Sequence, residues 1–296
     1  MSSLRIVFLF LPVFLWACGD DGVEIPRVRH RGPETPAPPP AQARISAGDV
    51  ERLAREAAAL AERWAGRRFE KRPAARLVER RVLAEALQEW VLPLIPISRR
   101  PRGARKPPPV RGKGEDEAEA RAVGAFLAER LGAFYAGSRR GILVSPPAPR
   151  GREAGEIPRQ VVRAEILREA LRALDARMHG TARRLREAPD GAVLNVRLAL
   201  GFGHAAWAAE EILAAEGHAS ALSPVLSRFR RGAKPLPAVL EGWRSRMLFA
   251  LNDGRLFFRS MARSTAGDPS AVIFAHPPDS PAKLLDPRLY RVERKP

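Results

Sequence analysis

The chain lacks the residues on which several common chemistries depend. Cys18 is the single cysteine among 296 residues, which excludes an internal disulfide. The sequence contains no Gly-rich phosphate loop and no internal repeat, and Ser145 and Ser220 have no neighbouring motif typical of a nucleophile. These absences disfavour nucleotide-binding, solenoid and serine-hydrolase functions.

Acidic residues are also scarce: 33 Asp and Glu stand against 51 Lys and Arg, a formal charge of +18. This excess indicates either an anionic partner or an Arg-rich background composition without function. Residues 98–113 hold seven basic side chains and no acidic one. We expect a disordered basic insertion over 98–114, either solvated or in contact with anionic lipid or glycan. Nucleic acid is disfavoured because no aromatic residue is interleaved for base stacking.

A long apolar run occurs only near the N-terminus. Arg5 precedes an apolar segment, 6–16, that is too short to span a bilayer and ends in Leu15-Trp16-Ala17-Cys18. This ending resembles the lipobox of bacterial lipoproteins. The resemblance implies removal of residues 1–17, a diacylglyceryl anchor on Cys18, and a periplasmic or surface-facing place in the cell envelope. The alternative is an ordinary secretory signal with Cys18 in its apolar region.

The rest of the sequence predicts a tether followed by a folded part. Residues 18–45 are Pro-rich and predict an extended tether, and residues 46–296 are apolar enough to bury a core. Apolar periodicity predicts a helix-dominated α+β fold with a small sheet. The expected helices are 50–64, 82–91, 115–135, 163–179, 192–220 and 243–261, the last interrupted at 252–254, and the expected strands are 73–79 and 141–145.

The segment 163–179 predicts an amphipathic helix with an unusual polar pattern. Arg168, Glu169 and Arg172 occupy the frame in which zinc peptidases place His-Glu-x-x-His, where two His bind Zn²⁺ and the Glu activates water. Both His positions are Arg in this chain.

Several segments, taken in order, resemble a family of bacterial His-Glu-x-x-His metallopeptidase-like proteins of the gluzincin type. The matching segments are 127–135 (LAERLGAFY), 141–144 (GILV), 163–174 (RAEILREALRAL), 213–220 (LAAEGHAS) and 277–290 (PPDSPAKLLDPRLY). The resemblance covers about residues 65–290 and implies a zincin-like fold.

The resemblance also assigns positions within the site. It implies that Glu169 is a vestigial general base and that Glu216 occupies the place of the third zinc ligand. Arg168 and Arg172 replace the His ligands, Met178 replaces a further His, and Asp286 replaces a His in the tail. Arg has no lone pair for a metal and stays protonated, so we expect no zinc cofactor and no peptidase activity.

Charge balance suggests what replaces the metal. We expect Arg168 or Arg172 to pair with Glu216, although solvated Arg side chains would also fit the sequence. A displaced metal site formed by His179, His204, His218 and Glu216 is disfavoured, because these spacings do not share a helix face.

The function expected from the sequence is therefore that of a lipid-anchored envelope protein with a catalytically inactive, metallopeptidase-like domain. It would bind or scaffold a peptide or protein in the inherited cleft. The alternatives are an active hydrolase with an altered metal site and an electrostatic tether to an anionic envelope polymer.

Overall fold

The computed structural model describes residues 45–103, 112–139, 141–146, 159–230, 235–265 and 268–292. The expected signal segment, Cys18 and all of the expected tether but its last residue lie outside these ranges, as does the centre of the basic segment, 104–111. Within the described ranges, every helix is too short or too polar to cross a bilayer.

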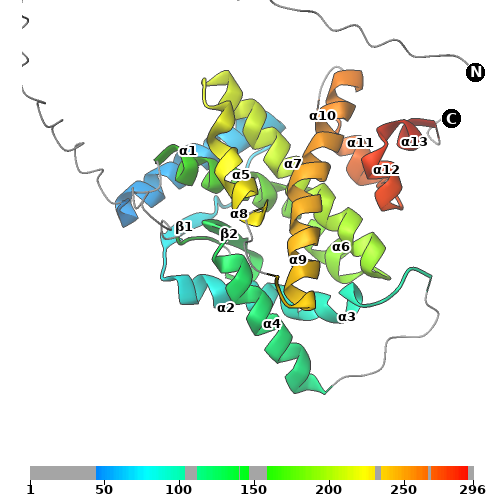
Figure 1. Cartoon of the computed structure of the whole chain (residues 1–296). Helices are drawn as coiled ribbons and strands as arrows, with labels where there is room; N and C mark the ends of the chain where they lie inside the picture. Colours follow the sequence, from blue (N-terminus) through cyan, green and yellow to red (C-terminus); the bar gives the residue numbers. More distant parts are fainter. Residues whose placement is uncertain are drawn as a thin grey trace, which may run out of the picture. The chain divides into compact units, whose positions relative to one another are not determined.

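The described residues form a small three-stranded mixed sheet, which lies near α1 (Ala47–Ala65) and α2 (Arg80–Val91) in Figure 1. The strand order is β1-β3-β2, with β1 (Ala74–Leu77) parallel and β2 (Ala133–Ala136) antiparallel to β3 (Gly141–Val144). The sequence predicts β1 and β3 correctly. β2 is therefore an edge strand with β3 on one side only.

The expected helix over 115–135 is wrong in its last part. The helix α4 (Lys113–Ala128) ends before Gly132, and residues 133–136 form β2 instead. The apolar residues there fit a helical pattern, but Phe134 and Tyr135 also have high strand propensity. Pairing with β3 decides between the two, since Phe134 lies opposite Leu143 in the antiparallel register.

Helices pack around the sheet. In Figure 1, α1 and α5 (Arg159–His179) lie above the strands, and α2 and α4 lie below them. The start of α1 follows its sequence signal, because Ser46 and Asp49 form a reciprocal capping box.

The amphipathic character expected for 163–179 is wrong. Every residue of α5 from Ala164 to Asp175 is buried, including the charged ones. The helix is enclosed because α1, α7 (Gly191–Ala215) and β2 all pack against it. Its charged side chains must therefore find partners inside the protein.

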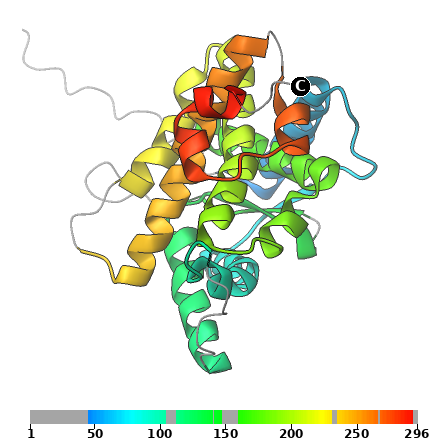
Figure 2. The same cartoon turned by 90° about the vertical axis from the view of Figure 1, so that its right-hand side faces the viewer.

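The interruption expected at 252–254 is a change of helix type. Between α9 (Ala238–Leu248) and α10 (Gly254–Thr265), residues Phe249–Asp253 form a π-helical turn. Figures 1 and 2 show α9, this turn and α10 as one continuous rod. The rod crosses α7 with direct backbone contact, since a Cβ on Gly203 would lie 2.4 Å from the carbonyl carbon of Gly254.

The remaining elements are short. They are η1 (Leu92–Leu94), α3 (Ile95–Ser98), η2 (Gly137–Arg139), α6 (Thr181–Arg186), η3 (Ala219–Leu222), α8 (Ser223–Arg230), α11 (Ser270–Ala275), α12 (Pro281–Leu285) and α13 (Pro287–Val292). Together with the larger helices and the small sheet, they confirm a helix-dominated α+β architecture.

The disordered insertion expected at 98–114 is wrong at both ends. Ser98 ends α3, and α4 already begins at Lys113. Arg99 is held by ion pairs with Asp116 and Glu119, which explains why the start of this basic segment belongs to the fold.

Candidate functional site

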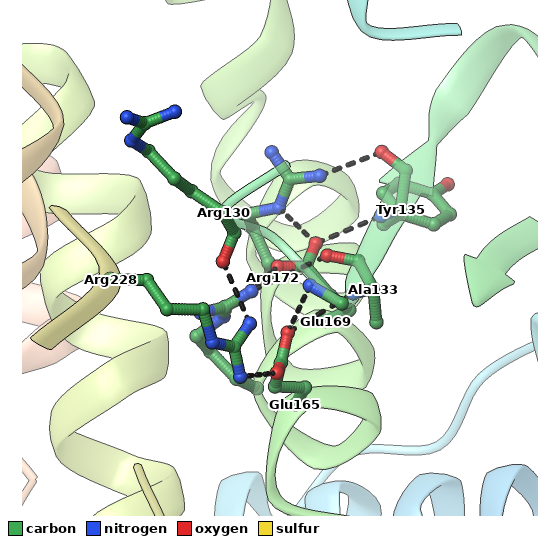
Figure 3. A network of polar contacts seen from close by, with 9 residues as sticks. Arg130, Ala133, Tyr135, Glu165, Glu169, Arg172 and Arg228 are labelled. Carbon is green, nitrogen blue, oxygen red and sulfur yellow. Dashed lines mark hydrogen bonds and ion pairs between the residues drawn. The ribbon is translucent and has the colours of Figure 1, made fainter. Parts of the chain in front are cut away.

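The outer edge of β2 is paired with side chains of α5 instead of with another strand (Figure 3). Glu165 accepts the amide of Ala133 at 3.1 Å, and Glu169 accepts the amide of Tyr135 at 2.8 Å. Arg168 donates to the carbonyl of Ala133 at 3.4 Å, and Arg172 donates to the carbonyl of Tyr135 at 2.7 Å. All four outward backbone groups of Ala133 and Tyr135 are therefore satisfied.

This pairing works because the helix and strand repeats nearly coincide. Residues four apart on a helix rise by roughly 6 Å, and residues two apart on a strand by roughly 6.8 Å. Glu165 and Glu169 are four residues apart on α5, as are Arg168 and Arg172, while Ala133 and Tyr135 are two apart on β2. The polar pattern that resembles a vacated zinc motif is thus a ladder that fixes α5 to β2. We call Glu165, Arg168, Glu169 and Arg172 the α5 ladder.

Glu169 is the centre of the α5 ladder and is fully buried. Its carboxylate accepts hydrogen bonds from Arg168 at 2.8 Å and from Arg172 at 2.7 Å. Burial acts to raise the pKa of Glu169, but the charges of Arg172 and Arg168 outweigh it, and the pKa lies below its usual value. Glu169 is therefore an ion-paired carboxylate with no free position for a substrate proton.

Aromatic rings enclose the guanidinium of Arg172. Its central carbon lies 4.3 Å from the ring centre of Phe134 and 4.5 Å from that of Phe202. Such stacking stabilises a buried guanidinium through the ring faces.

Glu165 extends the ladder to α8. Arg228 donates to Glu165 at 2.7 Å and to the carbonyl of Arg130 at 2.7 Å, so it links α8 to both α5 and the segment before β2. The Glu165 carboxylate also accepts the amide of Gly132. It approaches so closely that a Cβ at Gly132 would lie 2.7 Å from it, which explains the glycine at this position.

These residues do not fit a catalytic zinc ion. Arg168 and Arg172 offer only hydrogen-bond donors, and both oxygens of Glu169 already accept from them. Glu216 is not part of this group. It forms a bidentate pair with Arg163 at 2.5 and 3.0 Å near the surface, and the hydrogen bond from Arg163 lowers its pKa. The expected pairing of Glu216 with Arg168 or Arg172 is therefore wrong, as is the expectation of solvated Arg side chains. Met178 is 39% exposed, and Asp286 pairs with Arg288.

The histidines weighed for a displaced metal site do not assemble one. Across the ranges that the structure describes, no three His, Cys, Asp or Glu side chains are placed to hold a metal ion. His204 instead pairs with Asp175 at 2.8 Å and lies 3.7 Å from Asp268, and His179 stacks on Phe274. Burial acts to lower the pKa of His204, but Asp175 and Asp268 outweigh it and raise the pKa to about 10. His204 is thus a buried cation that links α5 and α7 to the C-terminal part.

A large groove opens at the C-terminal end of β2. Its volume is about 790 Å³, within the range of ligand sites. Its lining combines aromatic rings and alanines with charged side chains, of which four are basic and two, Glu70 and Glu89, are acidic. The aromatic and alanine residues include Trp90, Phe134, Tyr135, Ala173 and Ala176, and the exposed basic residues are Lys71, Arg72, Arg177 and Arg186. Because Phe134 also stacks on Arg172, the α5 ladder supports one wall of this β2 groove.

Sequence reasoning missed Glu165, Asp175 and Arg228. Glu165 and Glu169 are four residues apart, as are Arg168 and Arg172. All of the remaining positions of 164–174 are apolar. A helix with so little polar surface is expected to be buried, and its charges are then expected to be paired. This signal points to the ladder. No comparable signal identifies Arg228, which lies 63 residues from its partner.

Comparison with known proteins identifies no relative: no family model matches the chain, and neither a curated protein nor a solved structure does.

Proposed function

We propose that this chain is a lipid-anchored protein of the bacterial cell envelope whose folded part binds a peptide segment without cleaving it. In this proposal the domain is metallopeptidase-like and has exchanged its metal chemistry for the α5 ladder. The lipobox-like ending at Cys18 supports the anchor, and residues 18–45 would hold the folded part away from the membrane.

The observation that carries the proposal is the β2 groove. Its lining combines apolar and aromatic residues with exposed basic side chains. Arg72 and Arg177 are engaged by Glu62 and Glu70, whereas Lys71 and Arg186 have no ion-pair partner among the described residues. These two cations are available to a ligand. The groove therefore suits an extended peptide with apolar side chains and an acidic group.

The α5 ladder argues against hydrolysis in the same region. A general base needs a free oxygen within reach of the attacking water, and a metal needs lone-pair donors. Glu169 is 0% exposed and fully engaged, and its neighbours are guanidinium groups. We therefore favour binding over hydrolysis as the function of this region.

Peptide selection tests the binding proposal. Random peptides displayed on phage would be selected on the full chain, and we expect enrichment of sequences with apolar and acidic residues. Binding of an enriched peptide should be lost in Ala176→Phe, which fills the groove, and weakened in Lys71→Glu with Arg186→Glu. Arg263→Glu, an exposed charge reversal on α10 away from the groove, serves as the control for a general charge effect. Failure to enrich any peptide, or binding that ignores all groove variants, would overturn the proposal.

The anchor has a separate test. Cys18→Ser should move the protein from the membrane fraction to the soluble fraction and abolish labelling by radioactive palmitate. If Cys18→Ser stays in the membrane fraction, Cys18 is not the anchor.

A further inference from the structure

A small cavity is lined by Arg168 and by residues of α7, α8 and α10. Its volume is about 20 Å³, enough for one water molecule or one monatomic ion. Helices α5, α7, α8 and α10 and their neighbouring turns enclose it. The lining residues are Arg168, Ala206, Glu210, Leu222, Ser223, Val225, Leu226, Leu251 and Arg255.

Arg168 and Arg255, which both line this cavity, each have one buried donor without a hydrogen-bond partner within the described residues. They are Nη1 of Arg168 and Nε of Arg255. The other nitrogens of Arg168 donate to Glu169 and to the carbonyl of Ala133, and Nη1 of Arg255 donates to Glu210. Because an unsatisfied buried donor is costly, an occupant of the cavity is expected to accept hydrogen bonds.

The carboxylate of Glu210 lines the same cavity but is already used. It accepts from Arg255 at 2.8 and 2.9 Å and from Arg259 at 2.5 Å. Glu210 is therefore a poor acceptor for a further hydrogen bond from a water molecule. Its negative charge is more than balanced by the guanidinium groups of Arg255 and Arg259.

The charged side chains that line the cavity carry excess positive charge. Two guanidinium groups, Arg168 and Arg255, and one carboxylate, Glu210, give a net charge of +1. Arg259 adds a further cation through its ion pair with Glu210. Uncompensated charge is expensive in a protein interior, so an anion is favoured over water.

We propose that this cavity binds one monatomic anion, with chloride as the simplest occupant, held by Arg168 Nη1 and Arg255 Nε. Ser223 lines the cavity and is exposed, so it lies on the route by which an ion would enter from solvent. The anion would complete the charge balance behind the α5 ladder. This inference is independent of the peptide-binding proposal, since the cavity and the β2 groove have different lining residues.

Halide-dependent stability tests the site. The melting temperature of the full chain should rise saturably with sodium chloride or bromide, compared with sodium gluconate at equal ionic strength, because gluconate is too large for the cavity. Arg255→Lys keeps a charge for Glu210 but removes the Nε donor, so the halide-specific rise should disappear. Arg263→Lys, an exposed change on the same helix, should retain the rise.

Diffraction gives a second readout that does not depend on any variant. Crystals grown in bromide should show an anomalous peak within hydrogen-bond distance of Arg168 Nη1. A cavity that holds water in bromide, together with equal melting temperatures in halide and gluconate, would overturn the proposal.

Discussion

The Glu169 carboxylate accepts the backbone amide of Tyr135 at 2.8 Å, so a helix side chain takes the role that a neighbouring strand would have. Exposed edge strands are prone to pairing with other chains, and proteins commonly cover them. Here α5 covers β2 and satisfies its hydrogen bonds. The same carboxylate forms ion pairs with two buried guanidinium groups, those of Arg168 and Arg172, which makes Glu169 a structural residue in this account.

Hydrogen exchange tests this relationship locally. The amides of Ala133 and Tyr135 should exchange slowly although β2 is an edge strand, because Glu165 and Glu169 hold them. In Glu169→Gln the Tyr135 amide should exchange at least about tenfold faster, while the amide of Ile142 in the central strand should change less. Equal protection of Tyr135 in both proteins would contradict the ladder.

Metal removal should leave the protein unchanged. Because Arg168 and Arg172 cannot ligate a metal, the purified chain should contain far less than one zinc per molecule. Prolonged treatment with EDTA should not shift the melting temperature, and added zinc should not raise it. A stoichiometric metal whose removal lowers the melting temperature would refute this reading of the site.

Stability should depend on the protonation of His204. The pKa of His204 is about 10 in the folded protein, against 6.5 for an unperturbed imidazole. Its contribution to the free energy of unfolding is complete below about pH 6.5 and is lost as pH rises toward 10. Wild type should therefore lose more stability than His204→Gln between about pH 6 and pH 9.5, in denaturant titrations. Parallel losses in the two proteins would show that His204 is not charged.

The crossing of α7 and α10 depends on two glycines. Gly203→Ala should destabilise the protein by about 1–3 kcal/mol or more, because its Cβ would meet the backbone of Gly254 at 2.4 Å. Gly242→Ala on α9 is the matched control. Its Cβ would meet only the end of Arg246 at 3.4 Å, and alanine favours a helix by about 1 kcal/mol. Denaturant unfolding should give opposite signs for the two changes.

Much of the fold follows from local sequence signals. The capping box at Ser46, the apolar periodicity of α1 and α2, and the apolar run of β3 each predict their element. β2 could not be predicted in the same way. Its residues continue the apolar pattern of α4, and only the pairing of Phe134 with Leu143 shows that they are extended.

The candidate site was less predictable than the fold. The sequence drew attention to Arg168, Glu169 and Arg172, but it could not show that Glu169 pairs with both Arg while Glu216 pairs with Arg163. Partner choice among many Arg and Glu depends on packing that a single sequence does not encode locally. A ligand-binding cleft was expected, but the residues that line the β2 groove were not predicted, because separate elements supply them.

The most direct measurement compares the unfolding free energies of Glu169→Gln and Glu216→Gln by denaturant titration. Glu169→Gln leaves two buried guanidinium groups without their counter-charge and should cost roughly 3–5 kcal/mol. Glu216→Gln breaks only a partly exposed pair and should cost less than about 1 kcal/mol. If Glu169 were a catalytic base, its replacement would leave stability nearly unchanged. A Glu169→Gln protein as stable as wild type would therefore contradict the structural role of Glu169.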